Sequence, residues 1–323
     1  MLETGGLQKT TVIHPYERVH VGKVIVQNAR LNGSLKVGFQ MQKREPAAEE
    51  AAALVQQEGA QISQLITAAE HLNFGADSLT IAQIGEICDR ESVHFVDVEF
   101  PPKQGAVFMP NEEPDKVISW RRPQEFMDAS YDVFKEAIEP DDIRQGSLGD
   151  CWFMCSLSAI AEFPQLVKNV FVNPARLSAA AEDEWSGQKN EHGSYKLRFC
   201  KGGEWHSVTI DDFFPCYPGK GPIFSKSHGE ELWVLLIEKA YAKLHGNYYT
   251  LRGGWAYEGM MDLTGAPTSQ FKLDDPDLDH DEMWRKVTRR LGEASCVCVC
   301  VCMTFIFHIQ PLQYPCVVVC QAA

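Results

Sequence analysis

The chain has 323 residues, with 30 Lys and Arg against 44 Asp and Glu, and a formal net charge of −14. Apolar residues make up 45% of it and charged residues 23%, as in an ordinary globular protein. This composition excludes disordered, fibrous and disulfide-stapled miniature proteins, and the length predicts roughly two domains. The acidic balance argues against nucleic acid or anionic lipid as the main partner and favours divalent cations or basic partners.

The 11 cysteines fall into two groups, because five are scattered and six crowd into residues 296–320. The N-terminal segment lacks the basic start and apolar core of a secretory signal. We therefore expect a cytoplasmic protein whose scattered cysteines are free thiols. We also expect no membrane span, and the sequence leaves the oligomeric state open.

The first 94 residues predict a leader of mixed structure. Residues 20–40 alternate apolar and polar side chains around Asn32 and Gly33, which predicts a β-hairpin. Residues 46–72 are rich in Ala, Glu and Gln with apolar residues at helical spacing, which predicts a long amphipathic helix. A shorter helix is predicted from residue 77 or 78 to about residue 88. None of these elements carries recognisable chemistry.

The segment 95–140 is interrupted by prolines and predicts a loop-like boundary before the main domain. After it, a glycine-containing turn and Asp150 precede an almost wholly apolar run that Pro164 closes. This order predicts a buried helix with Asp150 at its N-cap and Cys151 in its first turn.

Two further patterns complete the predicted domain. Residues 194–213 alternate around Lys201, Gly202 and Gly203 and predict a second hairpin, while residues 230–246 predict a strong helix that ends at Gly246. No βαβ alternation is present, so the sequence predicts an α+β fold and not a parallel nucleotide-binding sheet.

The position of Cys151 suggests a nucleophile. A cysteine in the first turn of a helix faces the positive end of the helix dipole, which favours the reactive thiolate. The Gln145 amide, on the turn before it, could form an oxyanion hole together with the Cys151 backbone N–H. From the cysteine alone, a buried thiol without chemistry is the stronger reading, because free cysteines are usually buried.

The surrounding motif changes that reading. The set Gln145, Gly146, Gly149, Asp150, Cys151 and Trp152 resembles the active-site motif of calpains, which are papain-like, calcium-dependent cysteine proteases. The resemblance extends through FVDVEFPP, WRRP, GEWHSVTIDDFFP, EELWVLLIEKAYAKLHGNY and LRGGWAYEGMMDLTGA, so it covers about residues 95–295. It implies the first subdomain of a papain-like core, in which a central helix carries the cysteine beside small antiparallel strands.

The resemblance also implies roles for single residues. Cys151 would be the nucleophile and Gln145 the oxyanion donor. Gly253 and Gly254 match the pair whose backbone binds an extended peptide, a role that suits glycine because a missing Cβ permits close approach. A simple turn is the alternative for this pair.

A calcium ion is implied in the same subdomain. The matching ligands are the carboxylates of Asp142 and Glu231 and the backbone carbonyls of Lys135 and Ala137, which form the hard oxygen set that calcium prefers. The alternative is that both acids are ordinary surface residues.

The sequence offers no convincing general base. Papain-type enzymes place the histidine roughly 130 to 150 residues after the cysteine, and His280 and His308 are the only histidines near that distance. His280 lies in an acidic linker before a predicted helix, and His308 lacks the flanking motifs of calpains. We therefore expect the chain to stop before the His/Asn subdomain and to be inactive, or nearly so, by itself.

Residues 296–323 form a Cys- and Val-rich tail outside the resemblance. Its Cys-Val alternation is typical of translated non-coding or frameshifted sequence; as structure it predicts an exposed, aggregation-prone strand. A metal–thiolate tract is a further alternative, without the usual Cys-x-x-Cys spacing.

The sequence thus predicts a leader (1–94), a catalytic subdomain (95–295) and the tail (296–323). The predicted function is calcium-dependent endopeptidase action on intracellular proteins. The alternatives are a non-catalytic, calcium-binding interaction module and acyl transfer by the same nucleophile.

Overall fold

The computed structural model describes residues 18–21, 24–31, 34–41, 48–72, 78–109, 117–172, 187–272, 275–291, 295–300 and 316–321. The chain divides into two compact units, Met1–Ala51 and Ala52–Ala323.

The first unit contains a three-stranded antiparallel sheet. Its strands are β1 (Arg18–Val21), β2 (Val24–Leu31) and β3 (Ser34–Met41), in the order β1-β2-β3. The last pair of the β2–β3 ladder joins Leu31 to Ser34, so Asn32 and Gly33 connect the strands. The predicted hairpin is confirmed, and β1 adds a strand that the pattern does not predict.

Two helices follow, and both predictions are confirmed: α1 (Ala48–His71) and α2 (Ile81–Glu91). The second helix begins a few residues later than its pattern predicts, because Thr80 is its N-cap. The Thr80 side chain accepts the backbone N–H of Gln83, and the Gln83 side chain accepts the backbone N–H of Thr80.

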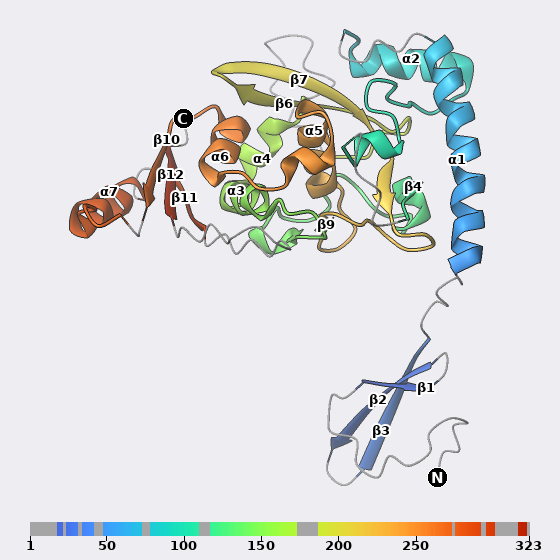
Figure 1. Cartoon of the computed structure of the whole chain (residues 1–323), viewed down its shortest axis with the longest axis horizontal. Helices are drawn as coiled ribbons and strands as arrows, with labels where there is room; N and C mark the ends of the chain where they lie inside the picture. The colour runs from blue at the N-terminus through green and yellow to red at the C-terminus, as the bar shows by residue number, and fades with distance from the viewer. Residues whose placement is uncertain are drawn as a thin grey trace. The chain divides into compact units, whose positions relative to one another are not determined.

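The remaining elements mix short strands with helices (Figure 1). The strands are β4 (Ser119–Arg121), β5 (Ile143–Arg144), β6 (Ser194–Lys201), β7 (Glu204–Asp211), β8 (Phe214–Cys216), β9 (Lys226–Ser227), β10 (Thr268–Lys272), β11 (Ser295–Cys300) and β12 (Cys316–Gln321). The α-helices are α3 (Cys151–Ala161), α4 (Pro164–Val170), α5 (Trp233–Leu244), α6 (Ala256–Thr264) and α7 (His280–Leu291). Short 3-10 helices occupy η1 (Gln104–Ala106), η2 (Pro123–Glu125), η3 (Pro140–Asp142) and η4 (Tyr248–Leu251).

The sheets of the second unit, Ala52–Ala323, are small. The described strands pair antiparallel as β4–β8, β5–β9, β6–β7 and β10–β12–β11. The β6–β7 hairpin turns at Gly202 and Gly203, whose φ angles of 62° and 86° lie in the left-handed region that favours glycine. Both the second hairpin and the α+β fold class are confirmed.

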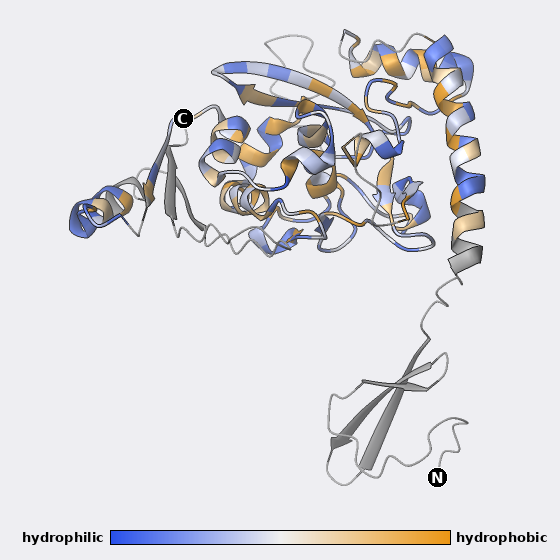
Figure 2. Ribbon diagram, viewed as in Figure 1, coloured by the Kyte–Doolittle hydropathy of each residue, from blue (hydrophilic) through white to orange (hydrophobic). Residues whose placement is uncertain are grey.

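Helix α5 is the centre of the core. Every residue from Trp233 to Ala242 is buried, and the Tyr241 ring stacks on Phe153 of α3 with 4.0 Å between ring centroids. In Figure 2 the ribbon of α3 is coloured mostly as hydrophobic, in line with the burial of most of its residues. The helix begins at Trp233, later than its sequence pattern predicts, because Glu231 bridges to Asp132 instead.

Charged residues of α5 also lie in the core. Lys239 forms a salt bridge with Asp211, and neither side chain is exposed. Asp211 also accepts the backbone N–H of Asp97 (2.8 Å), and Asp97 pairs with Lys243 (2.9 Å). Asp97 of the motif FVDVEFPP and Asp211 of the motif VTIDDFF are therefore the partners of the two lysines in LLIEKAYAKL.

Asp97 makes folding sensitive to pH. Burial raises the pKa of Asp97 to about 6, although Lys243 opposes the shift. An acid whose folded pKa exceeds its unfolded value stabilises the fold below the unfolded pKa and loses that contribution as pH rises through the folded pKa. As pH rises from 4 to 7, we expect wild-type unfolding free energy to fall by up to about 3 kcal/mol relative to Asp97→Asn. Denaturant titrations of both proteins across this range measure the difference; parallel curves would contradict the expectation.

The C-terminal residues add a separate sheet. Strand β12 pairs with both β10 and β11, so the Cys-Val run forms a strand over Ser295–Cys300, as its alternation predicts. His308 lies outside the described residues. Among the described helices, none has the length and apolarity that crossing a membrane requires.

Candidate active site

The turn before α3 is fixed by close backbone contacts. A Cβ atom on Gly146 would lie 1.9 Å from the carbonyl oxygen of Phe224, so only glycine fits there. The backbone N–H of Ser147 donates to the carbonyl of Ile223 (3.1 Å). Strand β5, which enters the turn, pairs with β9. These contacts hold the exposed Gln145 at the end of β5.

Cys151 is the first residue of α3 and is half-buried, and Asp150 is the N-cap. The predicted helix boundary is therefore confirmed. The positive end of the helix dipole favours a thiolate at this position. Burial raises the pKa of Cys88 to about 11 and that of Cys216 to about 12, which favours the protonated thiol at both positions.

Helix α3 is anchored to the segments that follow α5. The indole N–H of Trp152 donates to the carbonyl of Leu251 (2.8 Å), and the Ser156 hydroxyl donates to the carbonyl of Ala256 (2.9 Å). These two bonds hold the helix that carries Cys151 against residues 251–256, so its first residue has a defined position.

Gly253 and Gly254 lie beside the same turn. The backbone N–H of Gly253 donates to the carbonyl of Gly149 (2.9 Å), and Gly253 has a φ of +74°. A Cβ on Gly254 would lie 2.3 Å from Cε2 of Trp152. The structure brings the glycine pair and the Cys151 turn together. The positive φ favours glycine at position 253, and the close Trp152 ring leaves no room for a Cβ at position 254.

Replacing Gly254 with alanine is expected to displace the Trp152 ring and to destabilise the fold by about 1–3 kcal/mol. Thermal unfolding measures the loss. Gly105→Ala is the matched control, because no heavy atom lies within 4 Å of its added Cβ. Equal melting temperatures for the Gly254 variant and wild type would contradict this expectation.

Glu231 lies just before α5 and is 2% exposed, so it is not a surface acid. Its Oε1 accepts the backbone N–H groups of Lys135 (2.6 Å) and Glu136 (2.7 Å). Its Oε2 accepts the indole N–H of Trp233 (3.1 Å). The carboxylate therefore holds the 135–136 segment against the start of α5.

Asp142 is half-buried at the end of η3. Its Oδ2 accepts the backbone N–H of Glu139 (2.8 Å), and its carbonyl accepts the N–H of His228 (2.7 Å). Asp142 thus lies next to the segment that leads to Glu231.

Carboxylate and carbonyl oxygens are the ligands that calcium prefers, so these residues fit calcium in chemical type. Two carboxylates and the 135–137 backbone come from adjacent segments. Across the described residues, no group of three or more His, Cys, Asp or Glu side chains could hold a metal. A cation here would therefore need the carbonyls of Lys135 and Ala137 beside Asp142 and Glu231.

Sequence reasoning missed a buried acid behind the turn. Glu238 of α5 is 2% exposed and is a polar neighbour of Asp150, which is also fully buried. The only local signal is a lone glutamate within the apolar run WVLLIEKAYA. Of the histidines considered as bases, His280 is exposed at the start of α7.

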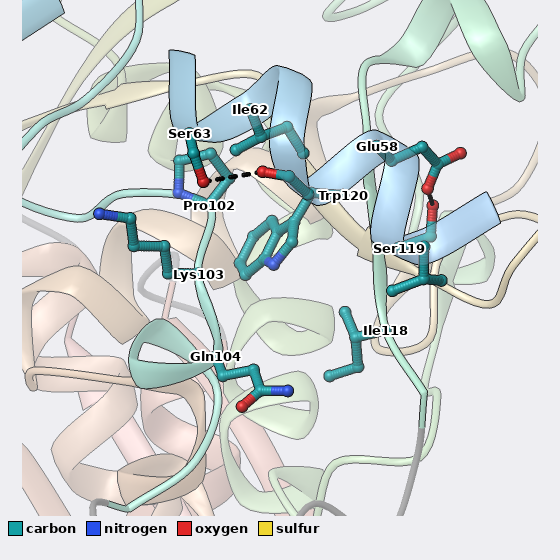
Figure 3. A pocket seen from close by; sticks show the side chains of 11 residues that line it. Glu58, Ile62, Ser63, Pro102, Lys103, Gln104, Ile118, Ser119 and Trp120 are labelled. Atoms are coloured by element: carbon teal, nitrogen blue, oxygen red, sulfur yellow. Dashed lines mark hydrogen bonds between the residues drawn. The ribbon is translucent and has the colours of Figure 1, made fainter. Parts of the chain in front are cut away.

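A cavity of about 310 Å³ lies elsewhere in this unit, between α1 and the segments around Pro102 and Trp120 (Figure 3). Ile62, Ile118 and the Trp120 ring form part of its wall, and Glu58 accepts a hydrogen bond from Ser119 at one end. No predicted site residue lines it.

The comparisons with known proteins agree on one family. The model of the calpain family cysteine protease matches residues 95–309. The calpain-type cysteine protease DEK1 of Arabidopsis thaliana is 34% identical over 235 residues, which cover 68% of this chain and 10% of that protein. Calpain-10 of Mus musculus is 36% identical over 186 residues, covering 56% of this chain and 26% of that protein.

Calpain-5 of Caenorhabditis elegans is 32% identical over 199 residues, covering 60% of this chain and 30% of that protein. The chain therefore spans between about a tenth and about a third of these relatives. The family match begins at the residue where the resemblance begins and extends to residue 309. Because that match covers about two thirds of the sequence, the chain belongs to the calpain family of cysteine proteases.

Proposed function

We propose that this chain carries the nucleophile of a calcium-dependent, calpain-type cysteine endopeptidase that cuts proteins at extended segments. The main support is the position of Cys151. It is the first residue of α3, with Gln145 on the preceding turn and Gly253 hydrogen-bonded to Gly149 beside it. The residues that we propose as nucleophile, oxyanion donor and peptide-binding backbone thus lie near one helix N-terminus.

In this proposal the Cys151 thiolate attacks the carbonyl carbon of the peptide. A C–S bond forms, and the electron pair moves to the carbonyl oxygen, where the Gln145 amide and the Cys151 backbone N–H stabilise it. The backbone of Gly253 and Gly254 binds the extended substrate. A histidine outside residues 95–295 takes the thiol proton before the attack. When the C–N bond breaks, the histidine gives this proton to the leaving amine, and water then hydrolyses the thioester to a free acid and the thiol.

Asp142 and Glu231 would hold calcium together with the carbonyls of Lys135 and Ala137, and the bound ion would supply positive charge between the two carboxylates. The chain offers a short connection from these ligands to the active site. Asp142 directly precedes β5, which leads into the turn of Gln145, and β9, its partner strand, lies a few residues before Glu231. A fixed Asp142 therefore restricts the start of the Gln145 turn.

The test is the rate at which a peptidyl epoxide labels Cys151 in the full chain, measured by intact-protein mass spectrometry with and without calcium. We expect calcium to accelerate labelling by about 5- to 150-fold, as coupled sites usually do. Asp142→Asn and Glu231→Gln should remove the acceleration. Asp141→Asn, which changes the neighbouring acid of the same turn, should keep it.

The other outcomes separate the alternatives. Labelling that is equally fast without calcium would reject the calcium site and keep the nucleophile. No labelling at any calcium concentration would reject the protease and favour the non-catalytic interaction module. Transfer of an acyl group to an added amine, in place of hydrolysis, would favour the acyl-transfer alternative.

A further inference from the structure

Asp150 does not do what its position predicts. An aspartate at an N-cap normally accepts a backbone N–H of the first helical turn, but the Asp150 side chain makes no such bond. The residue is fully buried, and neither carboxyl oxygen has a hydrogen-bond partner of standard geometry. Such a group is costly, so its surroundings must compensate for the lost water.

The first of its polar neighbours is a second buried acid, Glu238 of α5. Glu238 accepts both the backbone N–H (3.1 Å) and the hydroxyl (2.7 Å) of Ser225. Burial raises the pKa of both acids, and the charge of Asp150 raises that of Glu238 further. Two adjacent buried carboxylates repel each other, so ionisation of one opposes ionisation of the other.

The other polar neighbours of Asp150 are its own backbone N–H and the Gln145 side chain. A primary amide has two N–H groups, so one can bind a carboxyl while the other stays available. The same acid pair also supports the turn from behind, because Ser225 directly follows Phe224, whose carbonyl packs on Gly146. Glu238 thus lies beside Asp150 and also binds Ser225, in the segment that packs against the Gln145 turn.

We propose that Asp150 is a positioning residue for the oxyanion donor: its carboxyl group, held by Glu238, accepts one N–H of the Gln145 amide. The other N–H is then directed at the carbonyl oxygen of a substrate on Cys151. This inference rests on the proposed function. Hydrogen bonds of active sites are often long in the free enzyme and shorten when substrate binds, which accounts for the open geometry at Asp150. The gain is preorganisation, because an anchored donor needs no reorientation during reaction.

The test compares two reagents on the full chain. A peptidyl aldehyde forms a hemithioacetal with Cys151, and its oxygen needs the oxyanion donors; iodoacetamide alkylates the thiol at a saturated carbon and does not. We expect Gln145→Ala and Asp150→Ala each to weaken aldehyde binding at least about tenfold, with iodoacetamide rates changed by less than about twofold. The double variant should bind no more weakly than Gln145→Ala alone, because both changes remove one interaction.

Two further variants separate positioning from structural support. Asp150→Asn should keep aldehyde binding within about threefold of wild type, since the asparagine Oδ1 still accepts the amide N–H. Asp262→Ala removes an equally buried acid, bound by Lys201 and Tyr241, and should leave aldehyde binding unchanged.

Aldehyde binding that Gln145→Ala weakens and Asp150→Ala leaves unchanged would overturn the inference alone. Equal losses with both reagents in Asp150→Ala would also overturn it, because they would indicate general loss of structure. A wild-type chain that reacts with iodoacetamide but binds no aldehyde would instead reject the proposed function, and the inference with it.

Discussion

Replacing Cys151 with serine is expected to slow labelling by a peptidyl chloromethyl ketone by about three orders of magnitude or more. The reason is that a serine hydroxyl stays protonated where the helix N-terminus favours a thiolate. The rate is measured by intact-protein mass spectrometry under a fixed calcium concentration.

Cys155→Ser is the matched control. Cys155 lies one turn further along α3, is also half-buried, and is likewise outside any disulfide. This variant should label at the wild-type rate. The assignment of the nucleophile fails if Cys155→Ser, and not Cys151→Ser, abolishes labelling.

Replacing Lys239 with methionine is expected to lower the free energy of unfolding by about 3–5 kcal/mol, the usual loss when one partner of a buried ion pair is removed. Lys239 is fully buried and donates both to Asp211 and to the carbonyl of Phe213 (2.7 Å). Its removal leaves the Asp211 carboxylate in the core without a cation. Urea titration measures the loss.

Two variants make this result specific. Lys286→Met breaks a pair with Glu282 in which both side chains are about half exposed, and it should change stability by less than about 1 kcal/mol. Adding Asp211→Asn to Lys239→Met should recover part of the loss, because the uncompensated charge is removed. Equal losses of unfolding free energy in the two lysine variants would show that the buried pair contributes no more to stability than the exposed pair.

Elements with a complete local signal were predictable from the sequence. The pairs Asn32–Gly33 and Gly202–Gly203 lie between alternating segments, and in both cases these segments pair as antiparallel strands. The order of Asp150, Cys151 and an apolar run specifies the start of α3. In each case, residues close in sequence determine the structure.

Features that depend on distant partners were not predictable. Periodicity assigns the apolar residues of α5 to the core but gives no reason to bury Glu238 and Lys239. Their burial requires Asp150 and Asp211, which come from other elements. Likewise, β10 pairs with β12 across a long stretch of chain, and no local pattern specifies that partner.

In the candidate site, too, local sequence predicts some features, while others depend on partners that are distant in the chain. The motif around Gln145 and Cys151 predicts the chemistry, but only the structure brings Gly253 to Gly149 by a backbone hydrogen bond. It also gives Glu231 three N–H donors, although its sequence context is that of an ordinary helix start.

The central claim is that Cys151 is the nucleophile of the chain. Its most direct test treats the full chain with less than one equivalent of a peptidyl chloromethyl ketone and maps the adduct by peptide mass spectrometry. We predict one modified peptide with the label on Cys151, while the buried Cys88 and Cys216 stay unmodified. Label spread over several cysteines, or concentrated on a cysteine other than Cys151, would contradict the claim.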